Sequence, residues 1–129
     1  MMYSVKWLLV LSVAMLFFSC AEKEEPEVFV HVHNATIKVT VNLEQGGLNG
    51  QYTYTPISGV VVELYKTEED RTDYTDLVFT RTTDSGGLAV FENLEEEYYY
   101  LRISHPTYGT MLDETSTPDG TVSFVQVYY

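Results

Sequence analysis

From residue 28 onward, apolar and polar side chains alternate with a period of two along several short stretches. In TIKVTVNL, the apolar residues Ile37, Val39, Val41 and Leu43 fall on one side and polar residues fall on the other. Successive side chains of a strand point to opposite faces of a sheet, so this stretch is predicted to be a half-buried β-strand. No stretch repeats apolar residues three and four positions apart over three turns, so the pattern predicts no helix.

Further stretches have the Val, Ile, Thr, Tyr and Phe content that is typical of strands. Turn sequences rich in Gly, Pro, Asn and Asp separate them: QGGLNG, PISG, DSGG, HPTYG and TPDG. Six or seven short strands at this spacing predict an all-β chain that forms a single antiparallel β-sandwich of about seven strands. The further strand stretches are GVVVELYK (59–66), DLVFTRTT (76–83), LAVFEN (88–93), YYYLRIS (98–104) and TVSFVQVYY (121–129).

The chain opens with one Lys, an apolar run from Trp7 to Phe18, and then Ser19 and Cys20. This order is typical of a secretory signal peptide, and the run is shorter than the roughly 20 apolar residues that span a bilayer. An exported chain with one Cys cannot form an internal disulfide. The position of Cys20 resembles the lipobox of bacterial lipoproteins, in which that Cys is acylated and becomes the new N-terminus. We therefore expect residues 1–19 to be removed.

The residues after Cys20, AEKEEPE, are acidic and contain Pro, so they cannot bury apolar area and should form a disordered tether. They also resemble the export signal that some Gram-negative bacteria place after the lipidated Cys. The expected organisation is a lipoprotein signal peptide at 1–19, a lipidated Cys and tether at 20–27, and a β-sandwich domain at 28–129. The expected location is the outer membrane, lipid-anchored and exposed at the cell surface, with the periplasmic face as the alternative.

The chain is strongly acidic, with a formal net charge of −12 at pH 7 from 7 Lys and Arg and 19 Asp and Glu. Removal of Lys6 with the signal peptide leaves 6 basic residues against the same 19 acids, a net charge of −13. Such an excess repels nucleic acids and anionic lipid head groups, so we expect neither as a partner. About 110 residues then remain, enough for one small domain.

A further pattern is the order of residues between 59 and 101: Gly before a β-branched strand, Thr-Asp before a Gly turn, an apolar-x-Phe strand, an Asn-Leu corner and a Tyr-rich strand. This order resembles the Cna B-type and carboxypeptidase regulatory-like domains of the transthyretin-like (prealbumin-like) class, over roughly residues 36–129. Glu97 departs from the pattern, because the family usually has Gly there. The matching positions are Gly59, Val60, Val62, Leu64, Thr83, Asp84, Gly87, Val90, Phe91, Asn93, Leu94, Tyr99 and Leu101.

The resemblance implies chemistry that the residues of this chain do not support. An intramolecular isopeptide bond would need a core-facing Lys, a nearby carboxylate and an Asn or Asp on the last strand. Lys38 alternates opposite to the apolar face, Arg102 stands where the acid would come, and the last strand has neither Asn nor Asp. The chain also lacks the terminal Tyr-Arg-Gly-Ser of a related ureide hydrolase, a nucleophile elbow and a zinc-protease motif. We therefore expect no enzyme activity and no cofactor.

Two groups of residues suggest metal binding, but each has a simpler interpretation. In a strand, His31 and His33 would share one face about 7 Å apart, but the sequence offers no third ligand, so we expect solvated imidazoles and no metal. In residues 66–76, Asp70 and its neighbours Asp73 and Asp76 are three apart, whereas an EF-hand loop needs acids two apart. That segment is expected to be a solvated hairpin loop.

Tyrosines provide the strongest indication of binding. Tyr52, Tyr54, Tyr98 and Tyr100 are predicted on solvent-facing sides of strands, whereas Tyr99 should point inward. Exposed aromatic rows can stack on sugars or anchor a protein interface, but Tyr is also a common cross-strand residue. We therefore expect a non-catalytic cell-envelope lipoprotein with a structural or protein-binding role. The partners would be the membrane, through the lipid, and a protein or glycan; the alternative is a glycan-binding accessory lipoprotein of a polysaccharide-capture system, and a hydrolase is a distant third.

Overall fold

The computed structural model describes residues 29–129, so the predicted signal peptide, Cys20 and the acidic tether lie outside the described residues. Residues 29–34 contain neither helix nor strand, and most of the chain after them is strand. The elements in chain order are β1 (Ala35–Gly46), the 3-10 helix η1 (Leu48–Gly50), β2 (Tyr52–Pro56), β3 (Val61–Tyr65), α2 (Glu68–Asp73), β4 (Phe79–Thr82), β5 (Leu88–Leu94), β6 (Tyr98–His105), β7 (Gly109–Ser116) and β8 (Val122–Tyr128).

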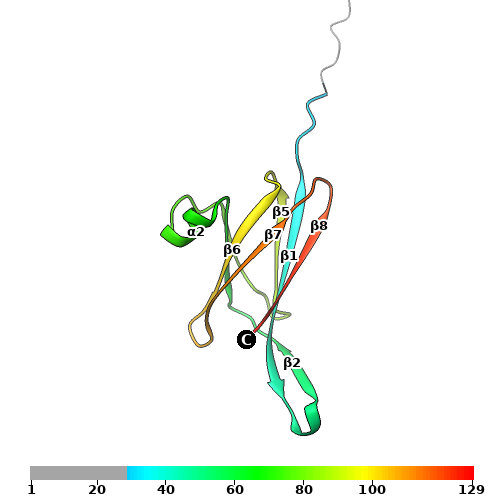
Figure 1. The fold of residues 1–129 in the computed structure, drawn as a ribbon. Coiled ribbons are helices and arrows are strands. Elements are labelled where there is room, and N and C mark those ends of the chain that lie inside the picture. Colours follow the sequence, from blue (N-terminus) through cyan, green and yellow to red (C-terminus); the bar gives the residue numbers. More distant parts are fainter. Residues whose placement is uncertain (1–28) are drawn as a thin grey trace, which may run out of the picture. The chain divides into compact units, whose positions relative to one another are not determined.

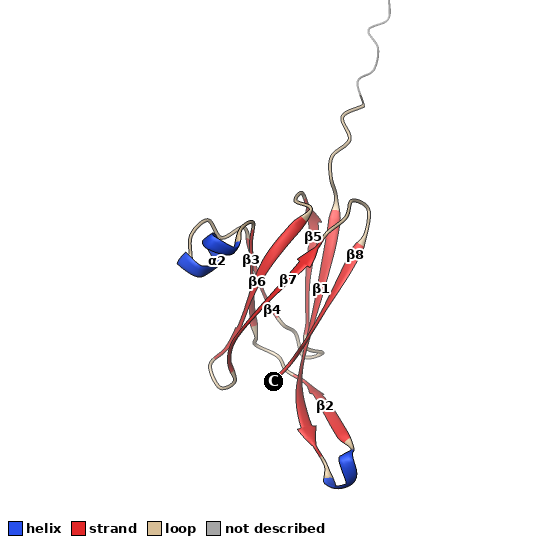
Figure 2. Ribbon diagram, in the orientation of Figure 1, coloured by secondary structure: helices blue, strands red, loops and turns tan. Residues whose placement is uncertain are grey.

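The strands form two sheets of four, which confirms the predicted all-β sandwich (Figure 1). In sheet A, β5 pairs with the first half of β1 and β2 with the second half, both antiparallel. β8 pairs with β1 in parallel. It pairs with residues of β1 that also pair with β5 and β2, so it must run along the other side of β1. Sheet B has the order β4-β3-β6-β7 and is antiparallel throughout (Figure 2). The sandwich therefore has eight strands among residues 29–129, with one parallel pair.

The core lies between the sheets, where the predicted apolar faces meet. Alternate residues of β1 and β6 are buried in it, and Tyr99 points inward as expected. Phe91 and Leu94 are buried as well, and burial of each such side chain contributes on the order of 2 kcal/mol. The buried apolar residues are Ala35, Ile37, Val39, Val41, Ile57, Val60, Val62, Leu64, Ala89, Phe91, Leu94, Tyr99, Leu101, Ile103, Val125 and Val127.

The predicted turn before β5 brings the backbone of Gly87 against β1. The Asp84 carboxylate accepts hydrogen bonds from the backbone N–H groups of Gly86 (2.9 Å) and Leu88 (3.0 Å). Gly87 has a φ of 72°, and a Cβ there would overlap the carbonyl oxygen of Val41. The carbonyl of Gly87 accepts the Val41 N–H at 2.8 Å, so only glycine fits this close approach.

The segment expected to be a solvated loop at 66–76 instead contains the helix α2. The hydroxyl of Thr67 accepts the Asp70 N–H at 3.1 Å and caps the helix, and three acids occupy its first turn. Tyr74 ends the helix in the left-handed conformation, with φ of 56°. The prediction was wrong because a helix of six residues is too short to show a period of 3.6. Arg71 is its buried residue.

Other details of the prediction also differ from the structure. The first strand begins at Ala35, so the strand considered for 28–33 is not formed in the described residues. β7 was not predicted, because it is mainly polar. The strand expected to carry Tyr52 and Tyr54 had no predicted bounds, because β2 is exposed on both faces. The strand predicted at 76–83 is shorter in the structure, where β4 begins at Phe79 and Leu77 is 47% exposed. Within residues 29–129, no helix is long and apolar enough to cross a membrane.

The corner at Glu97 is held by hydrogen bonds to its backbone carbonyls. The carbonyl oxygens of Glu96 and Glu97 accept hydrogen bonds from the hydroxyl (2.6 Å) and the N–H (2.8 Å) of Thr117, which is fully buried. The residue of this corner with positive φ is Asn93, at 56°. Position 97 therefore has no requirement for glycine in this chain, and the Glu97 side chain points to solvent.

Candidate binding surfaces

The four tyrosines considered as ligand contacts lie on different sheets. Tyr52 and Tyr54 are on β2 in sheet A, and Tyr98 and Tyr100 are on β6 in sheet B. They face outward, but from opposite layers of the sandwich, so they cannot form one patch. Each pair has to be assessed with its own neighbours.

In sheet B, the Tyr98 and Tyr100 rings are 5.2 Å apart and inclined by 57°. The guanidinium of Arg71 lies over the Tyr100 ring at 5.4 Å, and Tyr100 is only partly exposed. Partial burial raises the pKa of Tyr98, and the nearby Glu114 adds to the shift. Tyr100 therefore contributes to packing beneath α2, while Tyr98 remains open to solvent.

Two arginines attach α2 to the outward face of sheet B. Arg71 donates through Nη1 to the carbonyl of Asp113 on β7 at 2.8 Å. Arg102 on β6 donates to the carbonyl of Arg71 and to the hydroxyl of Tyr74, both at 2.6 Å, and its guanidinium stacks on the Tyr74 ring at 3.7 Å. Cation–π contacts and hydrogen bonds from charged donors are among the stronger polar interactions, so they hold the short helix on the sheet. Sequence reasoning missed Arg71 because the helix was not predicted.

Tyr65 on β3 is buried on the same side of sheet B. Its hydroxyl donates to the Glu63 carboxylate at 2.5 Å. Burial raises the pKa of Tyr65 to about 12, with the bond to Glu63 adding to the shift and Arg102 opposing it. The outward face of sheet B is therefore largely covered by side chains of the chain itself.

The outward face of sheet A carries exposed apolar and aromatic side chains. The rings of Tyr54 and Tyr128 are 5.4 Å apart, so β2 and β8 contribute to the same surface. Phe124 exposes 70% of its surface, and Lys38 lies beside it in register on β1. We call this surface the sheet A face; its exposed large residues are Tyr52, Tyr54, Val122, Phe124 and Tyr128. Of these, only the two residues of β2 were selected from the sequence, because strand pairing decides that β8 lies beside them.

β8 is also an open edge of sheet A. Its odd-numbered residues bond to β1: the carbonyls of Thr121 and Tyr129 accept from Thr36 (3.0 Å) and Glu44 (2.9 Å). Backbone groups alternate in direction along a strand, so those of Phe124, Gln126 and Tyr128 point away from β1. No strand among residues 29–129 pairs with that side of β8. An unpaired strand edge of this kind is a template for a further strand.

A groove runs between β8 and β7, the neighbouring edge of sheet B. Its ends are closed by hydrogen bonds, from Ser123 Oγ to the Ser116 carbonyl (2.7 Å) and from the Tyr129 hydroxyl to the Gly109 carbonyl (3.0 Å). Between these bonds lies a space of about 210 Å³. We call it the seam groove; it is lined by Ile103, Met111, Leu112, Asp113, Gln126, Val127 and Tyr128.

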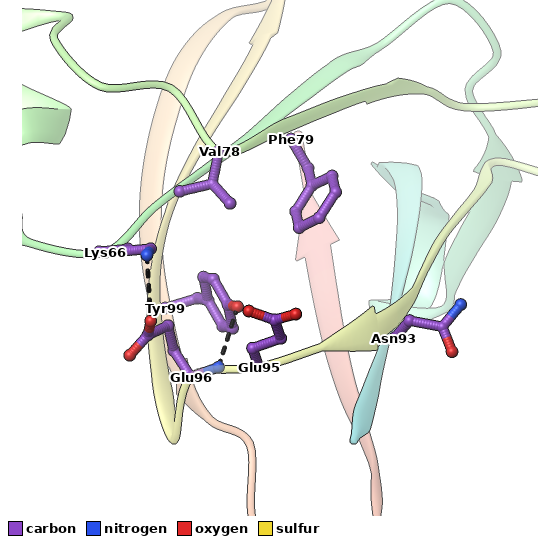
Figure 3. Close-up of a pocket in the computed structure, with 7 residues that line it drawn as sticks. All are labelled: Lys66, Val78, Phe79, Asn93, Glu95, Glu96 and Tyr99. Atoms are coloured by element: carbon purple, nitrogen blue, oxygen red, sulfur yellow. Dashed lines mark hydrogen bonds and ion pairs between the residues drawn. The ribbon is translucent and has the colours of Figure 1, made fainter. Parts of the chain in front are cut away.

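A second cavity of about 150 Å³ lies at the corner after β5 (Figure 3). The rings of Phe79 and Tyr99 and the carboxylate of Glu95 face the same space. Lys66 pairs with Glu96 at 3.1 Å, which raises the pKa of Lys66. Asn93 and Val78 complete the lining. The cavity combines an aromatic floor with charged groups at its rim, which is a common arrangement in small-ligand sites.

The predicted histidine pair does not share one strand face. His33 Nε2 donates to the carbonyl of Thr117 at 2.8 Å, and residues 29–34 are not in a strand. Within residues 29–129, no three His, Cys, Asp or Glu side chains are placed to hold a metal ion. Lys38 lies on the outward side of β1 between Phe124 and Val90, so its amine is directed away from the core.

Comparison with known proteins supports the fold and nothing finer. No protein-family model matches the chain, and no curated protein matches its sequence. Its structure is similar to part of the TIE protein of Bacillus anthracis, with a TM-score of 0.53 and 13% identity over 74% of this chain and 16% of that one. It is also similar to GBS52, the minor pilin of the Gram-positive pathogen Streptococcus agalactiae, with a TM-score of 0.56 and 16% identity over 77% of this chain and 45% of that one. The chain spans less than half the length of either protein.

A candidate carbohydrate binding protein of Pseudomonas aeruginosa gives a TM-score of 0.47 and 15% identity over 83% of this chain and 99% of that one. That likeness is too weak to support an argument. The two stronger ones are consistent with the Cna B-type β-sandwich that the sequence resembles.

Proposed function

We propose that the β-sandwich is a non-catalytic protein-binding module of a bacterial outer-membrane lipoprotein. The observation that supports this proposal is the sheet A face, where exposed aromatic and apolar side chains lie beside the open edge of β8. Contiguous apolar surface with an aromatic centre is typical of protein interfaces. An open strand edge adds backbone donors and acceptors, which an extended segment of a partner can satisfy.

The contrast between the two sheets supports a protein partner on sheet A. The most exposed aromatic residue of the sheet A face, Phe124, lies on the edge strand β8. On sheet B, Arg71 and Arg102 are already engaged by the chain itself, and Arg71 of α2 lies over the Tyr100 ring. Exposed aromatic side chains beside an open strand edge fit another polypeptide better than they fit a small ligand.

The test is site-specific photo-cross-linking in intact cells. A photoreactive phenylalanine analogue replaces Phe124 in the full chain, and the same analogue at the exposed Thr80 on β4 serves as the matched control. We expect a defined protein adduct from position 124 and none from position 80. Equal adducts at both positions, or none at 124, would contradict the proposal.

The proposed anchor rests on Cys20, which follows the apolar run and is the single cysteine of the chain. Mass spectrometry of the purified mature protein should find an acylated Cys20 at the N-terminus, with residues 1–19 removed. An unmodified Cys20 or retention of those residues would contradict lipid anchoring. Protease treatment of intact cells tests the orientation: we expect degradation of the domain, and full protection would contradict surface exposure.

The second candidate function is glycan binding, which the cavity of Figure 3 favours. Its aromatic floor, Phe79 and Tyr99, and its polar rim suit one polar ring. A glycan array probed with the wild type, Glu95→Gln and the Tyr98→Ala/Tyr100→Ala double variant separates this candidate from the first. Binding that is lost with Glu95→Gln would support the cavity, and binding lost only in the double variant would move the site to the outward face of β6. No binding to any glycan would remove this candidate.

A further inference from the structure

Residues 28–33, VFVHVH, have the sequence of a strand, yet their described part belongs to no strand. Phe29, Val30 and Val32 are 87%, 77% and 63% exposed. β-branched and aromatic residues favour strands, and apolar side chains in this density favour burial. The segment also contains no Asp or Glu, in a chain whose net charge is −12. Binding of this segment to another copy of the acidic chain would therefore add no carboxylate and no charge repulsion at the contact.

The open side of β8 offers backbone pairing and apolar contacts to an added strand. The backbone groups of Phe124, Gln126 and Tyr128 point away from β1, and the seam groove lies beneath them. A strand added at this edge would place alternate side chains over the sheet A face and into the groove. At about 3.3 Å per residue, the open stretch from Phe124 to Tyr128 is long enough for four or five paired residues.

We propose that Phe29–Val32 of one copy adds as a strand to the open side of β8 in a second copy. This inference rests on the proposed function and identifies its partner as the same chain. Val30 and Val32 enter the seam groove beside Val125 and Val127, while Phe29 lies on the sheet A face. Alternation puts both valines on the groove side of the added strand. There Ile103, Met111, Leu112 and Val127 supply apolar lining beside the polar Asp113 and Gln126.

The same chain cannot supply this strand to its own edge. His33 is bonded to the Thr117 carbonyl and the Asn34 N–H to the Asp119 carboxylate at 2.8 Å, so the end of the segment is fixed where β1 begins. The outer side of β8 is two strand spacings from β1, about 10 Å. Crossing that distance takes about three residues, which leaves too few of the segment to pair.

Each copy then has one donor segment and one acceptor edge, on different parts of its surface. An interface of this kind is heterologous and joins copies in a row or a ring. The expected products therefore include oligomers larger than dimers, which distinguishes strand addition from a symmetric dimer formed through the sheet A face.

Disulfide trapping with the full chain in cells tests the pairing. In the register that pairs Phe29 with Phe124 in a parallel strand, or with Tyr128 in an antiparallel one, His31 falls opposite Gln126 in both cases. Side chains directly opposite have Cβ atoms about 5 Å apart, close enough for a disulfide after a small adjustment. The double variant His31→Cys/Gln126→Cys should give a ladder of reducible oligomers. The matched control, His31→Cys/Glu92→Cys, uses an exposed residue of β5 on the other side of β1 and should give none.

Two further changes in the trapping variant show whether the ladder depends on a paired strand. Val30→Asp, added to this double variant, places a charge in the seam groove. Phe124→Pro, added to the same double variant, removes an outward-pointing N–H from β8. Each should reduce the trapped fraction at least tenfold, while Phe124→Ala in the same background should reduce it less. Thermal unfolding should be unchanged by Val30→Asp, since Val30 lies in no strand of its own domain.

The outcomes separate this inference from the proposed function. A ladder of equal yield in the Glu92 control, or a disulfide confined to single chains, would overturn pairing between copies. A photo-adduct to a different protein at position 124 without a His31–Gln126 ladder would also overturn it, while leaving the protein-binding function intact. Absence of both the adduct and the ladder would overturn both.

Discussion

The outward faces of the two sheets differ in what covers them. On sheet B, α2 lies over the strands, and Arg71 and Arg102 bond to backbone carbonyls of the chain itself. On sheet A, no helix of the described chain covers the face, and Phe124 and Tyr54 are exposed. The comparison indicates that side chains on the sheet B face contribute mainly to stability, whereas those on the sheet A face are available for binding.

The largest change in the free energy of unfolding at neutral pH is expected from Arg71→Ala, on the sheet B side of this comparison. The change removes the hydrogen bond to the Asp113 carbonyl and the contact with the Tyr100 ring, and it releases α2 from the sheet. Loss of a buried, charged donor should lower the free energy of unfolding by about 2–3 kcal/mol. Urea denaturation measures it, with Arg81→Ala on the exposed surface of β4 as the control. Equal stability of the two variants would contradict the role assigned to Arg71.

The next effect is a dependence of stability on alkaline pH. The pKa of Tyr65 is raised from 10.0 to about 12 in the folded protein, chiefly by burial. Because the folded state holds its proton more tightly, the stabilisation is complete below pH 10 and is lost as the pH rises from about 10 to 12. A shift of this size corresponds to a loss on the order of 3 kcal/mol. Urea denaturation between pH 9 and 12 should show a steeper loss in the wild type than in Tyr65→Phe; parallel curves would exclude Tyr65 as the cause.

A smaller effect is expected at the start of α2. Thr67→Ala removes the oxygen that accepts the Asp70 N–H at 3.1 Å. Loss of an N-cap costs about 1 kcal/mol, and Thr67→Ser should retain most of it. Thermal unfolding of the two variants measures the difference. If Ser and Ala at this position were equally stable, the cap would have no measurable role in holding the helix on sheet B.

Much of the fold could be predicted from the sequence because alternation is a direct consequence of burial on one face. β1 is the clearest case, since its apolar residues Ile37, Val39 and Val41 all lie in the core. The turn at Asp84 and Gly87 could be recognised for the same kind of reason, because the residue types match the backbone geometry. Helix α2 could not, since its six residues complete less than two turns.

The binding surfaces depend on which strands pair, and pairing is not encoded in the pattern of a single strand. Tyr54 was selected from the sequence, but its neighbour Tyr128 is 74 positions later and comes beside it only because β8 joins β1 in parallel. Phe124 was overlooked for the same reason. Tyr98 and Tyr100 were correctly placed on the outward side of β6, but the cover supplied by α2 was not foreseen.

The smallest effect on stability is expected at Phe124, and this sharpens the comparison most. Phe124→Ser removes a side chain that is 70% exposed, so the free energy of unfolding should change by no more than about 0.5 kcal/mol. Val125→Ser, one residue later on the buried side of β8, is the matched control and should cost several times more, because it places a hydroxyl in the core. Urea denaturation of both variants gives the two values. A large loss for Phe124→Ser would mean that the aromatic ring stabilises β8 itself, and the sheet A face would then resemble sheet B in function. A negligible loss would show that folding does not require the exposed ring, as the proposed binding role of the sheet A face demands.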